Sequence, residues 1–143
     1  MRGPYSAAGP YDDGGVSYEV RLERVPGGLR LAEWSGGELR RRAPVLDGAG
    51  LETLLGGAAE QGLLGEGELA CIAAGGGRGV SPGRSGEMRD ELRVEALADD
   101  RIRIGRWLYR PGTGQWELQQ APPMLPASRY AEALAGVSEA QGS

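Results

Sequence analysis

The chain has 143 residues, a formal net charge of −4, 26 Gly and 9 Pro. It contains no His and no Phe, and all 16 of its basic residues are Arg. The absence of His and Lys excludes a His-based triad, a His metal site, a Schiff-base lysine and a Walker-A loop. A single cysteine, Cys71, excludes an internal disulfide, and we expect it to be an inert buried thiol. The composition therefore favours a binding or structural protein over an enzyme. We expect this protein to bind no cofactor.

Hydropathy and net charge indicate in which compartment the protein occurs and which kinds of partner it can bind. No apolar run approaches the roughly 20 residues that a membrane-spanning helix needs, and the first five residues lack the apolar core of a signal peptide. We therefore expect a soluble, cytoplasmic protein with no membrane partner. The length allows one compact domain or two very small ones. Because the net charge is acidic, only a local arginine-rich face would attract nucleic acid.

The first half of the chain changes pattern twice. Residues 1–15 show no periodicity, which predicts a flexible N-terminal tail. Apolar and polar residues then alternate over 16–23, 29–34 and 38–46, which predicts three strands separated by Gly-containing turns. Asp47 is placed to cap a helix. The apolar residues of that helix fall at helical spacing: Leu51, Leu54, Leu55 and Ala58. A short second helix is indicated over 65–74.

The second half begins with a segment of Gly, Ser, Pro and Arg over 75–90, which predicts a linker. Alternation resumes over 92–96, 101–107 and 115–119, and prolines at 122, 123 and 126 are expected to end the sheet. Ser128 is placed to cap a last helix that carries Tyr130, Leu134 and Val137. Asp99 and Asp100 fall in a predicted tight turn with no third ligand nearby, so we expect no metal site.

The two halves share one order of elements. Residues 29–34 match residues 102–107, and each of these segments ends in a Trp. Residues 43–46 match residues 122–125 in their position within each half. This predicts an α+β fold of two tandem β-β-β(-β)-α repeats, 16–74 and 91–140, with antiparallel sheets, helices on one face and a pseudo-two-fold axis. Short hairpins of biased composition also look alike, which is the alternative. Since each half is too short to bury a good core alone, the repeats are expected to pack as one unit and the chain to form a homodimer.

Strand alternation also defines a candidate site. If Leu29, Leu31, Ile102 and Ile104 face the core, the opposite face mixes arginines with aromatic residues. Its members are Arg30, Trp34, Arg40, Arg42, Arg101, Arg103, Trp107 and Tyr109, with Gln115, Glu117 and Gln119 beside them. Aromatic rings stack on unpaired bases and arginines contact phosphates. The pattern therefore favours a protein that binds single-stranded DNA or RNA.

Two alternatives stay open for that face. It is also typical of a solvated sheet, or of a sheet buried against another chain in a non-catalytic structural or partner-binding protein. The run 40–42 is either a phosphate patch or a charged edge strand that resists aggregation.

The element order, the matched segments 29–34 and 102–107 and the helix that ends each half resemble the strand-rich repeats of purine-rich-element-binding (PUR), positive-cofactor-four and Whirly-type proteins. The resemblance covers most of the chain and rests on no diagnostic motif. It implies two copies of antiparallel strands followed by a helix, and binding of single-stranded nucleic acid on the sheet. The absence of Phe and Lys, which are common on those binding faces, is a departure from the pattern.

Overall fold

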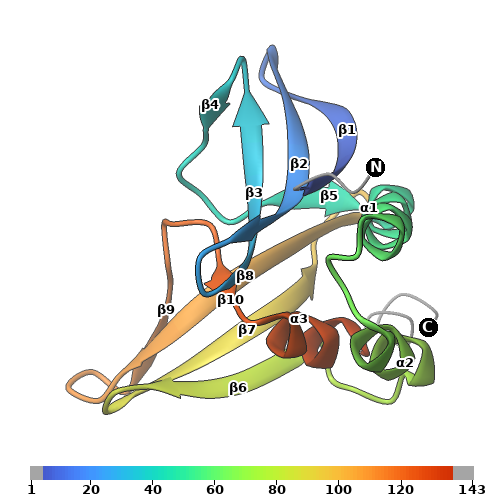
Figure 1. The fold of residues 1–143 in the computed structure, drawn as a ribbon. Coiled ribbons are helices and arrows are strands. Elements are labelled where there is room, and N and C mark those ends of the chain that lie inside the picture. The colour runs from blue at the N-terminus through green and yellow to red at the C-terminus, as the bar shows by residue number, and fades with distance from the viewer. Residues whose placement is uncertain (1–4, 137–143) are drawn as a thin grey trace.

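The computed structural model describes residues 5–136, which form an α+β fold of two antiparallel five-stranded sheets and three helices (Figure 1). Sheet A contains β1 (Tyr5–Asp13), β2 (Val16–Val25), β3 (Gly28–Ser35), β4 (Glu38–Leu39) and β10 (Met124–Leu125). Sheet B contains β5 (Val45–Asp47), β6 (Val80–Ser85), β7 (Met88–Ala96), β8 (Arg101–Arg110) and β9 (Gln115–Leu118). The helices are α1 (Gly48–Gln61), α2 (Glu66–Ala74) and α3 (Ala127–Leu134). The predicted α+β class with antiparallel sheets is confirmed.

Each sheet contains one short strand from the other half of the chain. The strand orders are β1-β2-β3-β10 and β5-β8-β7-β6, with β4 beside β3 and β9 beside β8. Next to these strands, Ile104 N donates to Pro44 O and Leu31 N donates to Pro123 O, both at 3.1 Å. Backbone hydrogen bonds therefore tie the two halves together in both directions.

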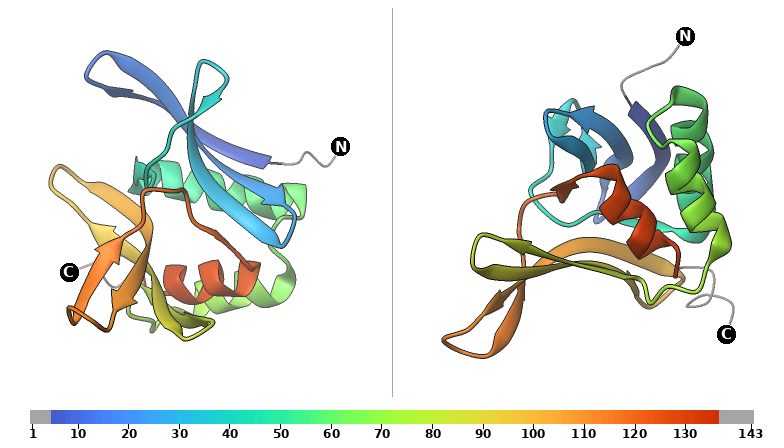
Figure 2. Two further views of the ribbon diagram at one scale, coloured as in Figure 1. Left: turned by 90° about the vertical axis from the view of Figure 1, so that its left-hand side faces the viewer. Right: turned by 60° about the horizontal axis from the view of Figure 1, so that its bottom comes forward.

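The core lies between the inner faces of the sheets and the helices. Alternate residues of the long strands are buried there, as the sequence pattern predicts: Val20, Leu22, Leu29, Leu31, Leu92, Ile102 and Ile104. Burial of each such side chain stabilises the fold by about 1.5–3 kcal/mol. Helix α1 packs on β1 and β5, α3 packs on β6 and β7, and α2 packs on α3 (Figure 2). The outer faces of both sheets are left for other contacts.

Helix α1 begins as predicted and runs unusually close to β1. The Asp47 side chain accepts a hydrogen bond from Gly50 N at 2.7 Å, which caps the helix. A Cβ at Gly57 would collide with Ser6 Oγ. That hydroxyl donates to Leu54 O at 2.9 Å. The glycine therefore costs helix propensity but allows β1 to lie against the helix.

Two segments without periodicity form strands, which corrects the predictions made for them. Within the predicted tail 1–15, residues 5–13 form β1, while residues 1–4 lie outside the described part. Within the predicted linker 75–90, Val80–Ser85 form β6, which leaves only 75–79 between α2 and the next strand. Both are edge strands rich in small residues, so backbone pairing rather than side-chain alternation defines them. Pro82 is tolerated because β6 lies at an edge.

The segments that change sheets were also mispredicted. The expected strand over 38–46 is interrupted: β4 and β5 belong to different sheets, and residues 40–44 bend between them. The prolines at 122–126 do not end the sheet, because Met124–Leu125 form β10. Helix α3 starts at Ala127 with Pro126 at the capping position, two residues before the expected Ser128 cap. Val137 lies outside the described residues.

The exchanged strands predict how the chain behaves when it is cut. Separate chains of residues 1–76 and 77–143 should each lack a stable fold, because β3 then loses β10 and β8 loses β5. Mixing them should restore the far-ultraviolet circular dichroism of the intact chain and one cooperative thermal transition. Cooperative unfolding of either piece alone, at the melting temperature of the intact chain, would contradict this expectation.

Candidate functional site

The outer face of sheet B carries arginines and aromatic residues. Strand register places eleven charged or aromatic side chains there, which together we call the sheet B face: Asp47, Arg84, Arg89, Glu91, Arg93, Glu95, Arg101, Arg103, Trp107, Tyr109 and Trp116. Five arginines meet three carboxylates, so this face has a net charge of +2. The whole chain carries −4. The net charge of the sheet B face therefore has the opposite sign to the net charge of the whole chain.

The aromatic rings of this face form a stack with two arginines. The guanidinium of Arg89 lies 4.3 Å from the Tyr109 ring centroid and 5.5 Å from that of Trp116. Arg93 lies 4.6 Å from the Trp107 ring and 5.1 Å from the Trp116 ring. The rings of Tyr109 and Trp116 are 5.3 Å apart. Cation–π contacts thus hold three half-exposed rings in place.

Carboxylates neutralise part of the positive charge. Glu95 accepts hydrogen bonds from Trp107 Nε1 at 3.0 Å and from Arg103 Nη2 at 3.3 Å. Arg93 Nε donates to Glu91 at 2.7 Å. A phosphate approaching Arg93 or Arg103 would have to compete with these carboxylates.

Arg84 and Arg89 differ from the other arginines of the face. They lie directly opposite each other on β6 and β7. Within the described residues neither forms an ion pair; among the arginines of this face only Arg101 shares that feature, and Arg101 lies opposite Asp47 rather than opposite another arginine. The other directly opposed charged residues in the described strands carry opposite charges: Glu23 with Arg30, Asp47 with Arg101, and Glu95 with Arg103. Like charges in this position destabilise a sheet. An anion bound between Arg84 and Arg89 would remove that penalty.

Sheet A presents a related outer face without the net positive charge of sheet B, since Arg21 and Arg30 lie there with Asp12, Glu19 and Glu23. Glu23 accepts hydrogen bonds from Arg30 Nε at 2.8 Å and from Trp34 Nε1 at 3.2 Å. Arg21 Nε donates to Glu19 at 2.6 Å and lies 5.0 Å from the Trp34 ring. The predicted residues Arg30 and Trp34 therefore lie on one sheet, while the predicted Arg101, Arg103, Trp107 and Tyr109 lie on the other.

Arg40 and Arg42 were predicted on the same face as Arg30, and the structure places them elsewhere. Arg42 Nε donates to the fully buried Glu33 at 2.6 Å, and Arg40 forms an ion pair with Glu33 at 3.2 Å. Both arginines also donate to Asp13 at 2.9 Å and lie over the ring of the core residue Tyr18. The hydrogen bond from Arg40 and the charge of Arg42 lower the pKa of Asp13. The chain bends at 40–44, so the strand alternation does not continue there.

The sequence pattern named four of the eleven residues of the sheet B face, and among the seven that it missed are Trp116, Arg84 and Arg89. Trp116 was placed on the core side, but it pairs directly with Tyr109 and shares its face, so that Glu117 points the other way. The length of the β8–β9 turn, which sets this register, was the signal that could have located Trp116. Arg84 and Arg89 fell in the predicted linker.

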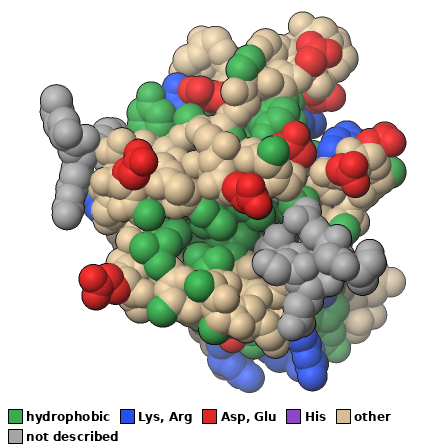
Figure 3. Space-filling view, turned by 90° about the vertical axis from the view of Figure 1, so that its right-hand side faces the viewer, with side chains coloured by type: hydrophobic (Ala, Val, Ile, Leu, Met, Phe, Trp, Pro, Cys, Tyr) green, Lys and Arg blue, Asp and Glu red, His purple; other side chains and the backbone are tan. Residues whose placement is uncertain are grey.

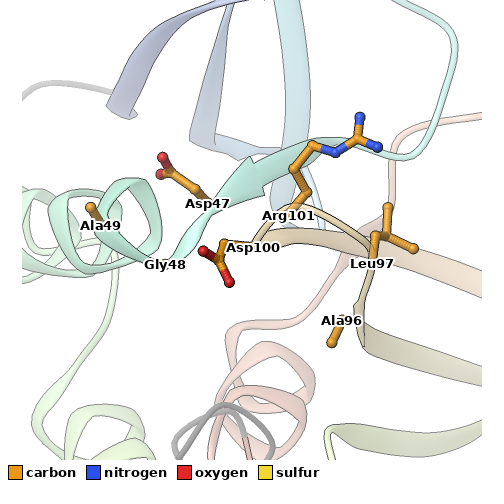
Figure 4. Close-up of a pocket in the computed structure, with 7 residues that line it drawn as sticks. All are labelled: Asp47, Gly48, Ala49, Ala96, Leu97, Asp100 and Arg101. Carbon is orange, nitrogen blue, oxygen red and sulfur yellow. The ribbon is translucent and has the colours of Figure 1, made fainter.

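A hollow of about 540 Å³ lies between the start of α1 and the β7–β8 turn (Figure 4). The side chains of Asp47, Asp100 and Arg101 point in different directions there. Asp47 already accepts from Tyr11 at 3.0 Å and from Gly50 N. Burial, and then the hydrogen bond and charge of Asp47, raise the pKa of Tyr11 to about 12. The groups that line this hollow do not converge as an acid–base pair does.

The helix side of the molecule is acidic and apolar. Helices α1 and α2 contain no arginine and carry Glu52, Glu60, Glu66 and Glu68 around apolar side chains (Figure 3). Cys71 is exposed on α2, contrary to the prediction of a buried thiol, because no residue of this helix is buried. None of the described helices is long and apolar enough to cross a membrane. Among residues 5–136, no three His, Cys, Asp or Glu side chains gather as metal ligands.

No protein-family model, curated protein or solved structure matches this chain. The resemblance to the PUR, positive-cofactor-four and Whirly-type repeats stays a prediction. The function therefore has to follow from the charges and contacts of the two outer faces.

The Glu33 cluster predicts a large effect on stability. Replacing Glu33 with Gln should lower the free energy of unfolding by about 3 kcal/mol, because Arg40 and Arg42 then lose their buried counter-charge. The matched control is Glu117→Gln, which changes an exposed ion pair and should shift stability by less than about 0.5 kcal/mol. Urea unfolding measures both. Equal effects would show that Arg40 and Arg42 do not have a structural role.

Proposed function

We propose that the chain is a non-catalytic protein that binds single-stranded nucleic acid on the sheet B face. The observation that carries this proposal is the directly opposed pair Arg84 and Arg89, which has no carboxylate partner among residues 5–136 and whose Arg89 lies beside the rings of Tyr109 and Trp116. A phosphate between the two guanidinium groups relieves their repulsion and leaves its base next to an aromatic ring. DNA and RNA share this chemistry.

The surface beside the pair fits an unstacked base. A hollow of about 170 Å³ lies between Pro82, Arg89, Glu91 and Trp116. Stacking on an aromatic ring is worth about 1–3 kcal/mol per base and needs a base that is free of a duplex stack. Base edges in a duplex are instead reached through its grooves. The hollow and the three half-exposed rings therefore favour a single strand.

The proposed roles divide the face into two groups. Trp107, Tyr109 and Trp116 stack on bases, and Arg84, Arg89, Arg101 and Arg103 contact phosphates. Arg30 and Trp34, which the sequence pattern also suggested, lie on sheet A, whose outer face has no net positive charge, and have no unpaired cation beside them. We leave them out of the proposed nucleic-acid site.

We also infer that the two halves are copies of one unit, with strand-bearing parts over 5–74 and 80–134. Both outer faces have the same cluster, in which a glutamate accepts from a tryptophan and from an arginine: Glu23, Trp34 and Arg30 on sheet A, and Glu95, Trp107 and Arg103 on sheet B. The exchanged strands share one register, since Val45 opposes Arg103 as Met124 opposes Arg30. A pseudo-two-fold relation accounts for both matches.

Binding measurements separate the two groups of residues. Arg89→Ala should weaken binding of a labelled mixed-sequence single strand and lower the slope of log K against log salt by roughly 0.7, the value for one phosphate contact. Trp116→Ala should reduce the binding free energy by about 1–3 kcal/mol, because one stacking contact is lost, and should leave the salt slope unchanged. Fluorescence anisotropy at several salt concentrations measures both quantities.

The matched control for these variants is Arg110→Ala. Arg110 belongs to the same β8–β9 hairpin but lies on its opposite side and pairs with Glu117 at 2.6 Å, so binding should not change. Equal losses for Arg110→Ala and Arg89→Ala, or no binding by the intact chain at about 50 mM salt, would rule out the sheet B face as the site.

The carboxylates of the face predict a gain of affinity. Glu91→Gln should tighten binding and raise the salt slope by roughly 0.7, because Arg93 is then released from its ion pair. Glu117→Gln removes a similar charge on the other side of the hairpin and serves as the control. Weaker binding of the Glu91→Gln protein would mean that phosphates do not reach Arg93.

A further inference from the structure

The outer face of sheet A contains a row of four side chains that crosses the sheet. Tyr5 on β1 opposes Glu23 on β2, Glu23 opposes Arg30 on β3, and Arg30 opposes Met124 on β10. The two ends of this row, Tyr5 and Met124, are 39% and 54% exposed and are among the few large exposed apolar residues of the described chain. The row therefore has apolar ends and an ion pair in its centre.

This order is complementary to itself when it is reversed. A two-fold axis that runs along the strands, between β2 and β3, would place a second copy of the row against the first in the opposite order. Tyr5 then meets Met124 of the second copy. The half-exposed Arg30 lies over the Glu23–Arg30 ion pair of the second copy, on the side of Glu23, which is itself only 8% exposed. Such an isologous contact repeats every favourable pair twice.

We propose that two copies of this chain associate face to face through this row of sheet A. A two-fold axis that runs along the row, perpendicular to the strands, would set Glu23 against Glu23 and Arg30 against Arg30, so the charges select the two-fold axis that runs along the strands. A polyanion is a poorer occupant, because Arg21 and Arg30 are both already paired with glutamates. The contact leaves sheet B open and does not rest on the function proposed above.

Cross-linking tests the register of the contact. In a Cys71→Ala background, chains with Tyr5→Cys and chains with Met124→Cys are treated with a short bis-maleimide, separately and as a mixture. The mixture should give far more covalent dimer than either chain alone, because Tyr5 and its own copy are separated by about three strand spacings of 4.8 Å each. Val16→Cys is an equally exposed control outside the row and should not cross-link to either chain.

Sedimentation tests the association itself. The intact chain should be a dimer at about 100 µM, and Met124→Glu should raise its dissociation constant by about tenfold or more, because the change occurs twice across the contact. Val16→Glu should leave the constant unchanged. A monomeric intact chain, a dimer insensitive to Met124→Glu, or preferential cross-linking of Tyr5→Cys to itself would each overturn the proposal. Binding of single strands by Met124→Glu should persist, which separates this test from that of sheet B.

Discussion

Two short backbone pairings decide where the other elements of this protein lie. β5 leaves the first half of the chain to pair with β8, and β10 leaves the second half to pair with β3. Helix α1 follows β5 directly, and α3 follows β10 after one proline, so these pairings deliver each helix to the inner face of a sheet. The inner faces of both sheets pack in the core, so the arginines and aromatic rings on the opposite side of the long strands lie on the outer faces.

Much of the arginine in this chain serves the fold before it serves any ligand. Asp90 is almost fully buried and accepts from Arg106 at 2.7 Å and Arg129 at 2.8 Å, just as Glu33 holds two other arginines. A buried carboxylate needs such partners, because its desolvation costs several kcal/mol. The number of arginines is therefore a poor guide to polyanion affinity. The informative arginines are those without a carboxylate, such as Arg84 and Arg89.

How far the sequence could predict the fold depended on strand length and position. The alternation of β2, β3, β7 and β8 is long enough to assign their buried faces correctly, and it placed Trp107 and Tyr109 on the outer face of sheet B. β1 and β6 are edge strands of small residues, which only their pairing with the adjacent strands β2 and β7 defines. β5 and β10 are too short to show a period, and only their pairing with the distant strands β8 and β3 defines them. A one-residue error in register reverses a face. This explains the wrong side predicted for Trp116, while the bend before β5 explains the wrong side predicted for Arg40.

The charge of the whole molecule and the charge of one face act together on a polyanion. Helix α2, with Glu66 and Glu68, lies behind α3 on the inner side of sheet B, away from the sheet B face. An approaching phosphate chain is thus repelled by one side of the molecule and attracted by the other, over a Debye length of about 8–10 Å at moderate salt. A stiff duplex would extend beyond so small a basic area. Under the proposed function, a flexible single strand could stay on that area, so a protein with this distribution of charge would discriminate by the stiffness of its ligand as well as by its charge.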